Sequence, residues 1–147
     1  MFVIVMGCGR VGARVAAQLS RAGHEVTILD TNPDAFERLD PDFAGTTLAG
    51  NGIDTDSLRR AGIERADAFL ACTQGDNRNI MASQIAQHIF GVVKVVTRIY
   101  DPLREETFKA LGLEAISPTV IAADHLIQAL GPDYLGDAPL VPTRDAG

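Results

Sequence analysis

The residues best suited to chemistry in this chain are three glycines that follow an apolar run near the N-terminus. Phe2–Met6 is followed by Gly7-Cys8-Gly9-Arg10-Val11-Gly12, which has the spacing G-x-G-x-x-G and leads into a predicted helix. The first glycine permits a tight bend, the second lets the backbone approach a pyrophosphate, and the third lets the helix pack closely on the strand. Free N–H groups at the start of the helix then bind the phosphates. The turn predicts a nucleotide site that includes Gly7, Cys8, Gly9, Arg10, Val11 and Gly12.

A carboxylate lies at the place that such a turn requires. Asp30 comes after the second apolar run, about 20 residues beyond the glycines, where it would accept hydrogen bonds from ribose hydroxyls. Thr31 follows it and is counted with the ligand contacts. A negative charge there repels a 2′-phosphate, which favours NAD over NADP. Arg10 would add a guanidinium beside the phosphates. The alternatives are a structural turn with Asp30 as a surface helix cap, and a solvated Arg10 that gains nothing from the helix dipole.

A second polar turn, Gly50-Asn51-Gly52, follows the third apolar run. In this kind of fold the adenine ring would lie there, next to Gly52. The Asn51 amide is able to hydrogen-bond the edge of a base. The alternative is a turn residue in the left-handed conformation that asparagine tolerates.

Polar residues also follow the fourth apolar run. Thr73 and Gln74 come directly after it, and Asn79 lies in the first turn of the next predicted helix. All three are counted as ligand contacts. The alternative is that Thr73 or Asp76 simply caps that helix.

Arg98 ends the fifth apolar run, at the same predicted edge of the sheet. An arginine after a β-branched run is unusual unless it meets an anion there. The alternative is an ion pair with a nearby acid such as Asp76 or Asp101.

The elements that must position these residues alternate between strands and helices. Strands are predicted at Phe2–Met6, Glu25–Leu29, Thr46–Ala49, Ala68–Cys72, Val92–Thr97 and Ala115–Ser117, and helices at Val11–Ala22, Pro33–Leu39, Asp54–Ala61, Asp76–Phe90, Pro102–Leu111 and Pro118–Leu130. This alternation predicts an α/β fold with a doubly wound, Rossmann-like, parallel six-stranded sheet and helices on both faces. Residues 1–130 then form one nucleotide-binding domain, and residues 131–147 form a flexible C-terminal tail.

Composition excludes several classes of protein. The 147 residues are 46% hydrophobic and 22% charged, as in ordinary globular proteins, and the net charge of −6 disfavours binding to nucleic acid. Cys8 and Cys72 have no metal-ligand spacing, so we expect neither a metal site nor a disulfide, and a reducing cytoplasm fits. Phe2–Met6 is too short for a signal peptide or a membrane span.

The sequence favours a sensor over an enzyme. No Ser–His–Asp or Cys–His arrangement falls at predicted strand ends, so no catalytic residue is assigned. After the predicted domain, residues 131–147 leave no room for a substrate domain. The alternative is a small NAD-dependent oxidoreductase whose substrate site comes from a partner chain.

Taken together, these residues resemble the TrkA N-terminal domain, also called the KTN or RCK N-terminal domain, of potassium-transport regulators. The resemblance covers residues 1 to about 130. The matching series is Gly7-Cys8-Gly9-Arg10-Val11-Gly12, Gly23-His24-Glu25-Val26 leading to Asp30, Gly50-Asn51-Gly52-Ile53-Asp54, Leu58, Ala61-Gly62-Ile63, Ala66-Asp67-Ala68, Thr73, Asp76, Asn79, Val96-Thr97-Arg98 with Asp101-Pro102, Leu111-Gly112 and Ser117-Pro118.

The resemblance implies a function. Such domains bind NAD(H) or ATP/ADP and assemble through their late helices into homodimers and often octameric rings. The ring docks on the cytoplasmic face of a membrane potassium transporter or channel subunit of the Trk/Ktr type and alters its gating. We therefore expect a cytoplasmic regulatory subunit, peripheral on the inner face of the membrane through its partner.

The resemblance also assigns residues to the ligand. The family pattern places phosphates at Gly7–Val11, ribose at Asp30 and the adenine side at Asn51 and Gly52, with further contacts at Thr73, Gln74 and Arg98. Arg10 is similar to a family arginine that reaches a phosphate, in some members one bound by the neighbouring subunit. Asp30 would serve the ribose of NAD(H) or of ATP/ADP equally, so the choice between them stays open.

The chain departs from the family pattern in three places. Asn51 stands where many members have Asp, and Ile53 where they have a small or hydroxyl residue. Thr119 follows Pro118 where some ATP-binding members carry an acid, so a cation site associated with that acid is not predicted. Most members continue into a C-terminal ligand-binding domain. A chain ending at Gly147 is expected to be either truncated or a short member that pairs with a longer TrkA-like partner.

Overall fold

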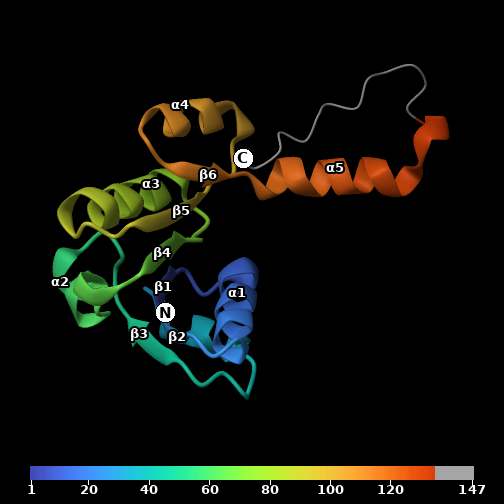
Figure 1. Cartoon of the computed structure of the whole chain (residues 1–147). Helices are drawn as coiled ribbons and strands as arrows, with labels where there is room; N and C mark the ends of the chain where they lie inside the picture. The colour runs from blue at the N-terminus through green and yellow to red at the C-terminus, as the bar shows by residue number, and fades with distance from the viewer. Residues whose placement is uncertain (135–147) are drawn as a thin grey trace.

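The computed structural model describes residues 1–134, which form a parallel sheet wrapped by helices (Figure 1). The strands are β1 (Phe2–Met6), β2 (Glu25–Asp30), β3 (Thr46–Ala49), β4 (Ala68–Ala71), β5 (Lys94–Arg98) and β6 (Glu114–Ile116). Their order in the sheet is β3-β2-β1-β4-β5-β6, and every neighbouring pair is parallel. The predicted six-stranded Rossmann-like sheet is confirmed.

The strand order reverses beside β1, and this reversal creates the place for a ligand. β1 pairs with β2 on one side and with β4 on the other. The connections after β1 and β4 therefore leave the sheet toward opposite faces. A crevice opens between them at the carboxyl ends of the strands, as in other doubly wound sheets.

Helices cover both faces of the sheet, as predicted. The helices are α1 (Arg10–Arg21), α2 (Thr55–Arg60), α3 (Asp76–Gln84), α4 (Glu105–Ala110) and α5 (Pro118–Leu130). α1 packs Ala13 and Ala16 against Val3, Val5 and Ile28 on one face. On the other face, α2 and α3 contribute Leu58 and Ala82 to a cluster with Ile4, Met6 and Phe69. The alternating β1 side chains thus face two separate cores, both closed to water.

Three predicted helices differ from those observed. Pro33–Arg38 is a 3₁₀ helix, Pro102–Arg104 is a 3₁₀ turn that leads into α4, and the predicted helix Asp76–Phe90 is α3 followed by a π-helical turn, Ile85–Ile89. A wider turn at the end of α3 lets the Phe90 N–H bond the Ile85 carbonyl, at 3.2 Å. It also brings the Val92 N–H to the Ala86 carbonyl, and β5 consequently begins at Lys94 instead of Val92.

α5 differs from the other helices because it projects away from the sheet (Figure 1). None of its residues is buried, and Val120, Ile121, Leu126 and Leu130 are exposed.

Within residues 1–134 no helix is long and apolar enough to cross a membrane. Of the predicted C-terminal tail, Pro132–Tyr134 forms a 3₁₀ turn. Residues 135–147 lie outside the described residues.

Candidate functional site

A cavity of about 680 Å³ lies at the carboxyl ends of the strands, where the strand order reverses. Its volume is in the range of small-molecule sites. All the predicted ligand contacts line it except Gly12 and Asn79; these are Gly7, Cys8, Gly9, Arg10, Val11, Asp30, Thr31, Asn51, Gly52, Thr73, Gln74 and Arg98. The fold therefore brings together residues from five of the six strand ends.

The glycine turn bends sharply at Gly7 and packs closely at Gly12. Gly7 has φ +103°, and its N–H donates to the Leu29 carbonyl at 2.7 Å, which ties the turn to the end of β2. A Cβ atom on Gly12 would overlap the Gly7 carbonyl oxygen, so Gly12 sets the close packing of α1 on β1. By contrast, a Cβ atom on Gly9 would meet nothing within 4 Å. Gly9 thus leaves space open beside the N-terminus of α1.

Asp30 anchors this turn from the neighbouring strand. Its carboxylate accepts the Cys8 N–H at 2.7 Å through one oxygen and the Asn32 N–H at 2.8 Å through the other. Each carboxylate oxygen has a further lone pair for a ligand hydroxyl. The alternative role of Asp30 as a helix cap is wrong, because Asn32 caps the 3₁₀ helix by accepting the Asp34 N–H at 3.1 Å.

Asn51 forms a local turn beside the cavity. Its side-chain oxygen accepts the Ile53 N–H at 3.2 Å. The turn role is confirmed, but the left-handed conformation is wrong, because only glycines have positive φ among the described residues. Gly52 lies against Met6, whose sulfur a Cβ atom would overlap. The Asn51 side-chain NH₂ makes no hydrogen bond within residues 1–134.

Asn79 does not line the cavity and instead positions two residues that do. It is fully buried, and its side-chain oxygen accepts from the Thr73 N–H at 3.0 Å and the Thr73 hydroxyl at 2.6 Å. Its NH₂ donates to the Thr73 carbonyl at 2.9 Å and the Arg98 carbonyl at 3.0 Å. These four bonds use the full capacity of the amide. We call this the Asn79 knot; it fixes the end of β4 relative to the end of β5.

Asp76 and Arg98 do not form the ion pair that we considered. Asp76 accepts the Tyr100 N–H at 2.7 Å and the Asp101 N–H at 3.1 Å, and it does not cap α3, because the N-cap is Gly75. Arg98 donates to the Cys72 carbonyl at 3.4 Å, and its guanidinium lies 4.4 Å from the centre of the Tyr100 ring. The buried Arg98 Nε has no partner among the described residues. Arg98 therefore reaches the cavity with its charge uncompensated.

Sequence reasoning missed several side chains of the cavity, among them Arg38, Arg78 and Tyr100. Arg78 follows Thr73-Gln74 in the first turn of α3, so its spacing carried a signal. Arg38 ends the 3₁₀ helix Pro33–Arg38, and Tyr100 lies in an irregular segment, where no periodicity places a side chain. With Arg10 and Arg98, the lining carries four arginines and one carboxylate, and none of these arginines has an ion pair within residues 1–134. The balance of charge suits an anion.

The two cysteines that line the cavity are buried thiols with raised pKa values. Burial, followed by the nearby Asp30 charge, raises the pKa of Cys8 to about 11, although Arg38 opposes this shift. Burial raises the pKa of Cys72 to about 11 as well, against a smaller opposite effect of Arg98. A protonated thiol is a poor nucleophile and a poor metal ligand. Across the described part of the chain, no group of three His, Cys, Asp or Glu residues is placed to hold a metal ion.

Comparison with known proteins extends these observations. The model of the TrkA-N domain family matches residues 3–119. The chain is 44% identical over 140 residues to the Trk system potassium uptake protein TrkA of Streptomyces coelicolor, a match that covers 95% of this chain and 62% of that protein. The chain thus spans about three fifths of that relative.

Two solved structures share the fold. The Kef C-terminal domain of Shewanella denitrificans, in an AMP-bound form, has a TM-score of 0.75 at 26% identity, over 94% of this chain and 84% of that one. The GsuK channel bound to NAD has a TM-score of 0.76 at 23% identity, over 91% of this chain and 24% of that one. Because the family model matches residues 3–119, most of its length, the chain belongs to the TrkA-N domain family.

Proposed function

We propose that this chain is the nucleotide-sensing part of a regulator of potassium uptake, and that its ligand is NAD(H) or ATP/ADP. The observation that carries the proposal is the cavity itself. A glycine turn, an adjacent carboxylate and four arginines line one space at the carboxyl ends of the strands. Backbone N–H groups and guanidiniums bind phosphate, and the Asp30 carboxylate binds ribose hydroxyls. The AMP bound to the Shewanella relative supports an adenine nucleotide.

The potassium-uptake part of the proposal rests on the Streptomyces relative, whose name assigns it to a Trk system. In the proposed arrangement the chain forms homodimers and rings, or pairs with a longer TrkA-like chain, and acts on the cytoplasmic side of a membrane transporter or channel. The ligand must favour one arrangement of the assembly, because equal affinity for two arrangements shifts neither. The arginines of the cavity are suited to this role, since their charges would meet the phosphates of a bound ligand.

The first test measures the contribution of Asp30 by calorimetry with ADP and NADH. Asp30→Ala is expected to weaken both ligands about tenfold or more, because a charge-assisted contact to ribose is lost. Asp34→Ala is the matched control: it removes a carboxylate of the adjacent 3₁₀ helix that does not line the cavity. If Asp30→Ala binds ADP and NADH as tightly as the wild-type chain does, the assignment of Asp30 to the ribose is wrong.

Asp30 also anchors the glycine turn, so a second measurement separates the two roles. 2′-Deoxy-ADP should bind the wild-type chain more weakly than ADP, and the Asp30→Ala variant should bind both equally. If the variant still prefers ADP over its 2′-deoxy form, the carboxylate supports the turn and does not hold the ribose.

The alternative function, a small NAD-dependent oxidoreductase, predicts that the chain consumes NADH when carbonyl substrates are added. The absorbance of the reduced nicotinamide measures this consumption.

A further inference from the structure

The cavity extends to both sides of β1, and its two ends differ. One end, beyond β2 and β3, has Asp30 and Asn51; the other, beyond β4 and β5, has Gln74, Arg98 and Tyr100. In a doubly wound sheet the two nucleosides of a dinucleotide lie on opposite sides of this point, with the pyrophosphate on the glycine turn. An adenine mononucleotide needs only the first end and the turn. The second end is therefore available for the second nucleoside of a dinucleotide.

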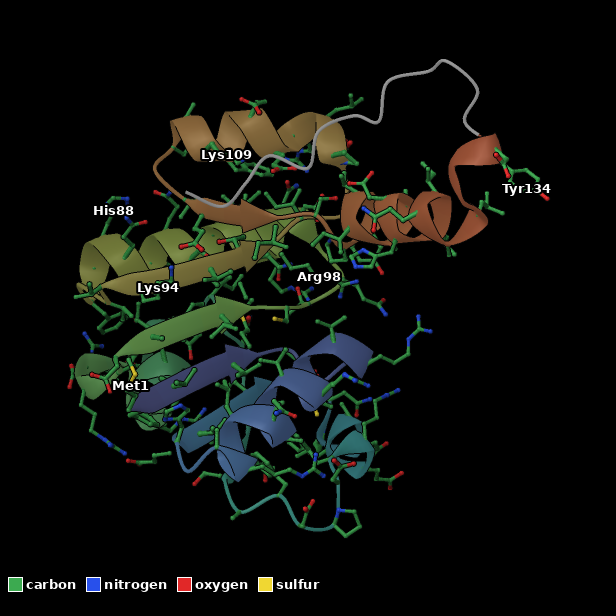
Figure 2. All side chains as sticks on the ribbon, turned by 45° about the vertical axis from the view of Figure 1, so that its right-hand side comes forward. Met1, His88, Lys94, Arg98, Lys109 and Tyr134 are labelled. Atoms are coloured by element: carbon green, nitrogen blue, oxygen red, sulfur yellow. The ribbon has the colours of Figure 1, made fainter. Side chains whose placement is uncertain are left out.

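Tyr100 is the one aromatic side chain among the residues that line the cavity. It is 43% exposed, and its ring lies against the Arg98 guanidinium, 4.4 Å from ring centre to Cζ. Figure 2 shows Arg98 at the edge where β5 ends, on the side from which α5 leaves the sheet. The stacked pair thus offers a flat surface at the second end of the cavity. Flat surfaces of this kind bind the faces of heteroaromatic bases.

The backbone of Tyr100 is held on both sides, so its ring has a defined place. The N–H donates to Asp76 at 2.7 Å, and the carbonyl accepts from the Thr119 hydroxyl at 3.3 Å. Asp76 starts α3 and Thr119 lies in the first turn of α5, so two helices fix this one residue. An exposed aromatic residue on an anchored backbone loses little conformational entropy when a base packs on it.

We propose that Tyr100 is a specificity-determining residue that lets this site distinguish a dinucleotide from an adenine mononucleotide, by packing against the base of the second nucleoside. This proposal rests on the nucleotide-binding function proposed above. Arg78 and Arg98 lie at the same end, and no carboxylate lines it. The reduced dinucleotide is therefore the suitable probe, because its nicotinamide ring carries no positive charge that the arginines would repel.

The test is calorimetry of NADH and ADP with Tyr100→Ala and Tyr100→Phe. Tyr100→Ala is expected to weaken NADH roughly tenfold, a typical loss for one stacked base, and to leave ADP within about twofold. Tyr100→Phe keeps the ring and should retain NADH affinity. Leu103→Ala is the matched control: it truncates an exposed side chain of the same segment that does not line the cavity. Thermal unfolding of each variant checks that the fold is retained.

Each other outcome overturns the proposal in a distinct way. Equal weakening of NADH and ADP would mean that Tyr100 acts only by holding Arg98 for the phosphates. Unchanged NADH affinity would mean that the second nucleoside does not reach Tyr100. A wild-type chain that binds ADP but not NADH would exclude a dinucleotide as the ligand. A wild-type chain that binds neither would contradict the proposed nucleotide-binding function itself.

Discussion

The two ends of the cavity are built from different kinds of groups. On the β2 side the ligand would meet the backbone of the glycine turn and one carboxylate, which two backbone N–H groups hold in place. On the β4 and β5 side it would meet the long side chains of Arg78, Arg98 and Tyr100. There the buried Asn79 knot holds the Arg98 carbonyl to the backbone of Thr73. The first end is formed within the chain segment 7–52, and the second joins the segments that follow the neighbouring strands β4 and β5.

In the proposed function, the first end would bind any adenine nucleotide, and the second end would distinguish one adenine nucleotide from another. Backbone groups in a tight turn are fixed before the ligand arrives, and any ligand with a phosphate and a ribose satisfies them. Side chains of arginine and tyrosine can reorient, so their contacts depend on what the ligand carries beyond its phosphates. We expect changes at the first end to affect all adenine nucleotides alike, and changes at the second end to affect them unequally.

The largest effect is expected from Gly12→Ala, at the point that both ends share. The added Cβ atom would overlap the Gly7 carbonyl oxygen and push α1 away from β1. We expect the free energy of unfolding to fall by about 3 kcal/mol, the upper part of the usual range for overpacking. That corresponds to a drop of about 10 °C in the melting temperature, measured by calorimetric or circular-dichroism scans.

Gly9→Ala is the matched control for this change. Its Cβ atom meets nothing within 4 Å, and the Gly9 backbone is extended, so stability should be unchanged. Its methyl group projects into the space beside the helix N-terminus, and we expect ADP and NADH to lose affinity to the same extent. A Gly9→Ala variant that binds both normally would show that phosphates do not approach this turn.

Next in size is Asn79→Ala, which removes the knot at the second end. Four hydrogen bonds are lost, and buried groups of Thr73 and Arg98 lose their partner, which costs about 2 kcal/mol. NADH should be weakened more than ADP, because only the second end loses its support. Gln84→Ala is the control on the same helix, since Gln84 makes one long hydrogen bond, to the Leu111 carbonyl at 3.4 Å. Equal losses for both ligands would contradict the separation of the two ends.

The smallest effect concerns two thiols, that of Cys8 beside Asp30 at the first end and that of Cys72 beside Arg98 at the second end. Since burial raises the pKa of Cys8 and of Cys72 to about 11, roughly one thiol in a thousand is ionised at pH 8, and iodoacetamide should label both very slowly in the folded chain. Labelling should rise about tenfold per pH unit up to that pKa. In Asn79→Ala we expect faster labelling of Cys72 alone, read by peptide mass spectrometry. Equal acceleration of Cys8 would show that the knot supports the whole cavity.

Much of the site was predictable because it depends on local spacing. The glycine turn, Asp30 and the ends of the strands follow from chain distance and from the rule that parallel strands share a carboxyl edge. The predicted role of Asn79 as a ligand contact has a different outcome, since the amide is buried and used entirely within the protein. Its polar type and its place in the first turn of the predicted helix Asp76–Phe90 gave no sign of that burial. The same type and place suit a positioning residue and a ligand contact equally.

Sequence alone therefore determined the parallel sheet, the glycine turn and the acidic residue beside it, because each follows from periodicity or from a short fixed spacing. Tertiary structure decided which polar side chains reach the cavity and which hold others in place. The Arg98 guanidinium packs on the Tyr100 ring instead of pairing with an acid, and Asp76 accepts hydrogen bonds from backbone N–H groups. Such choices depend on distances between segments far apart in the chain, and those distances exist only once the sheet has formed.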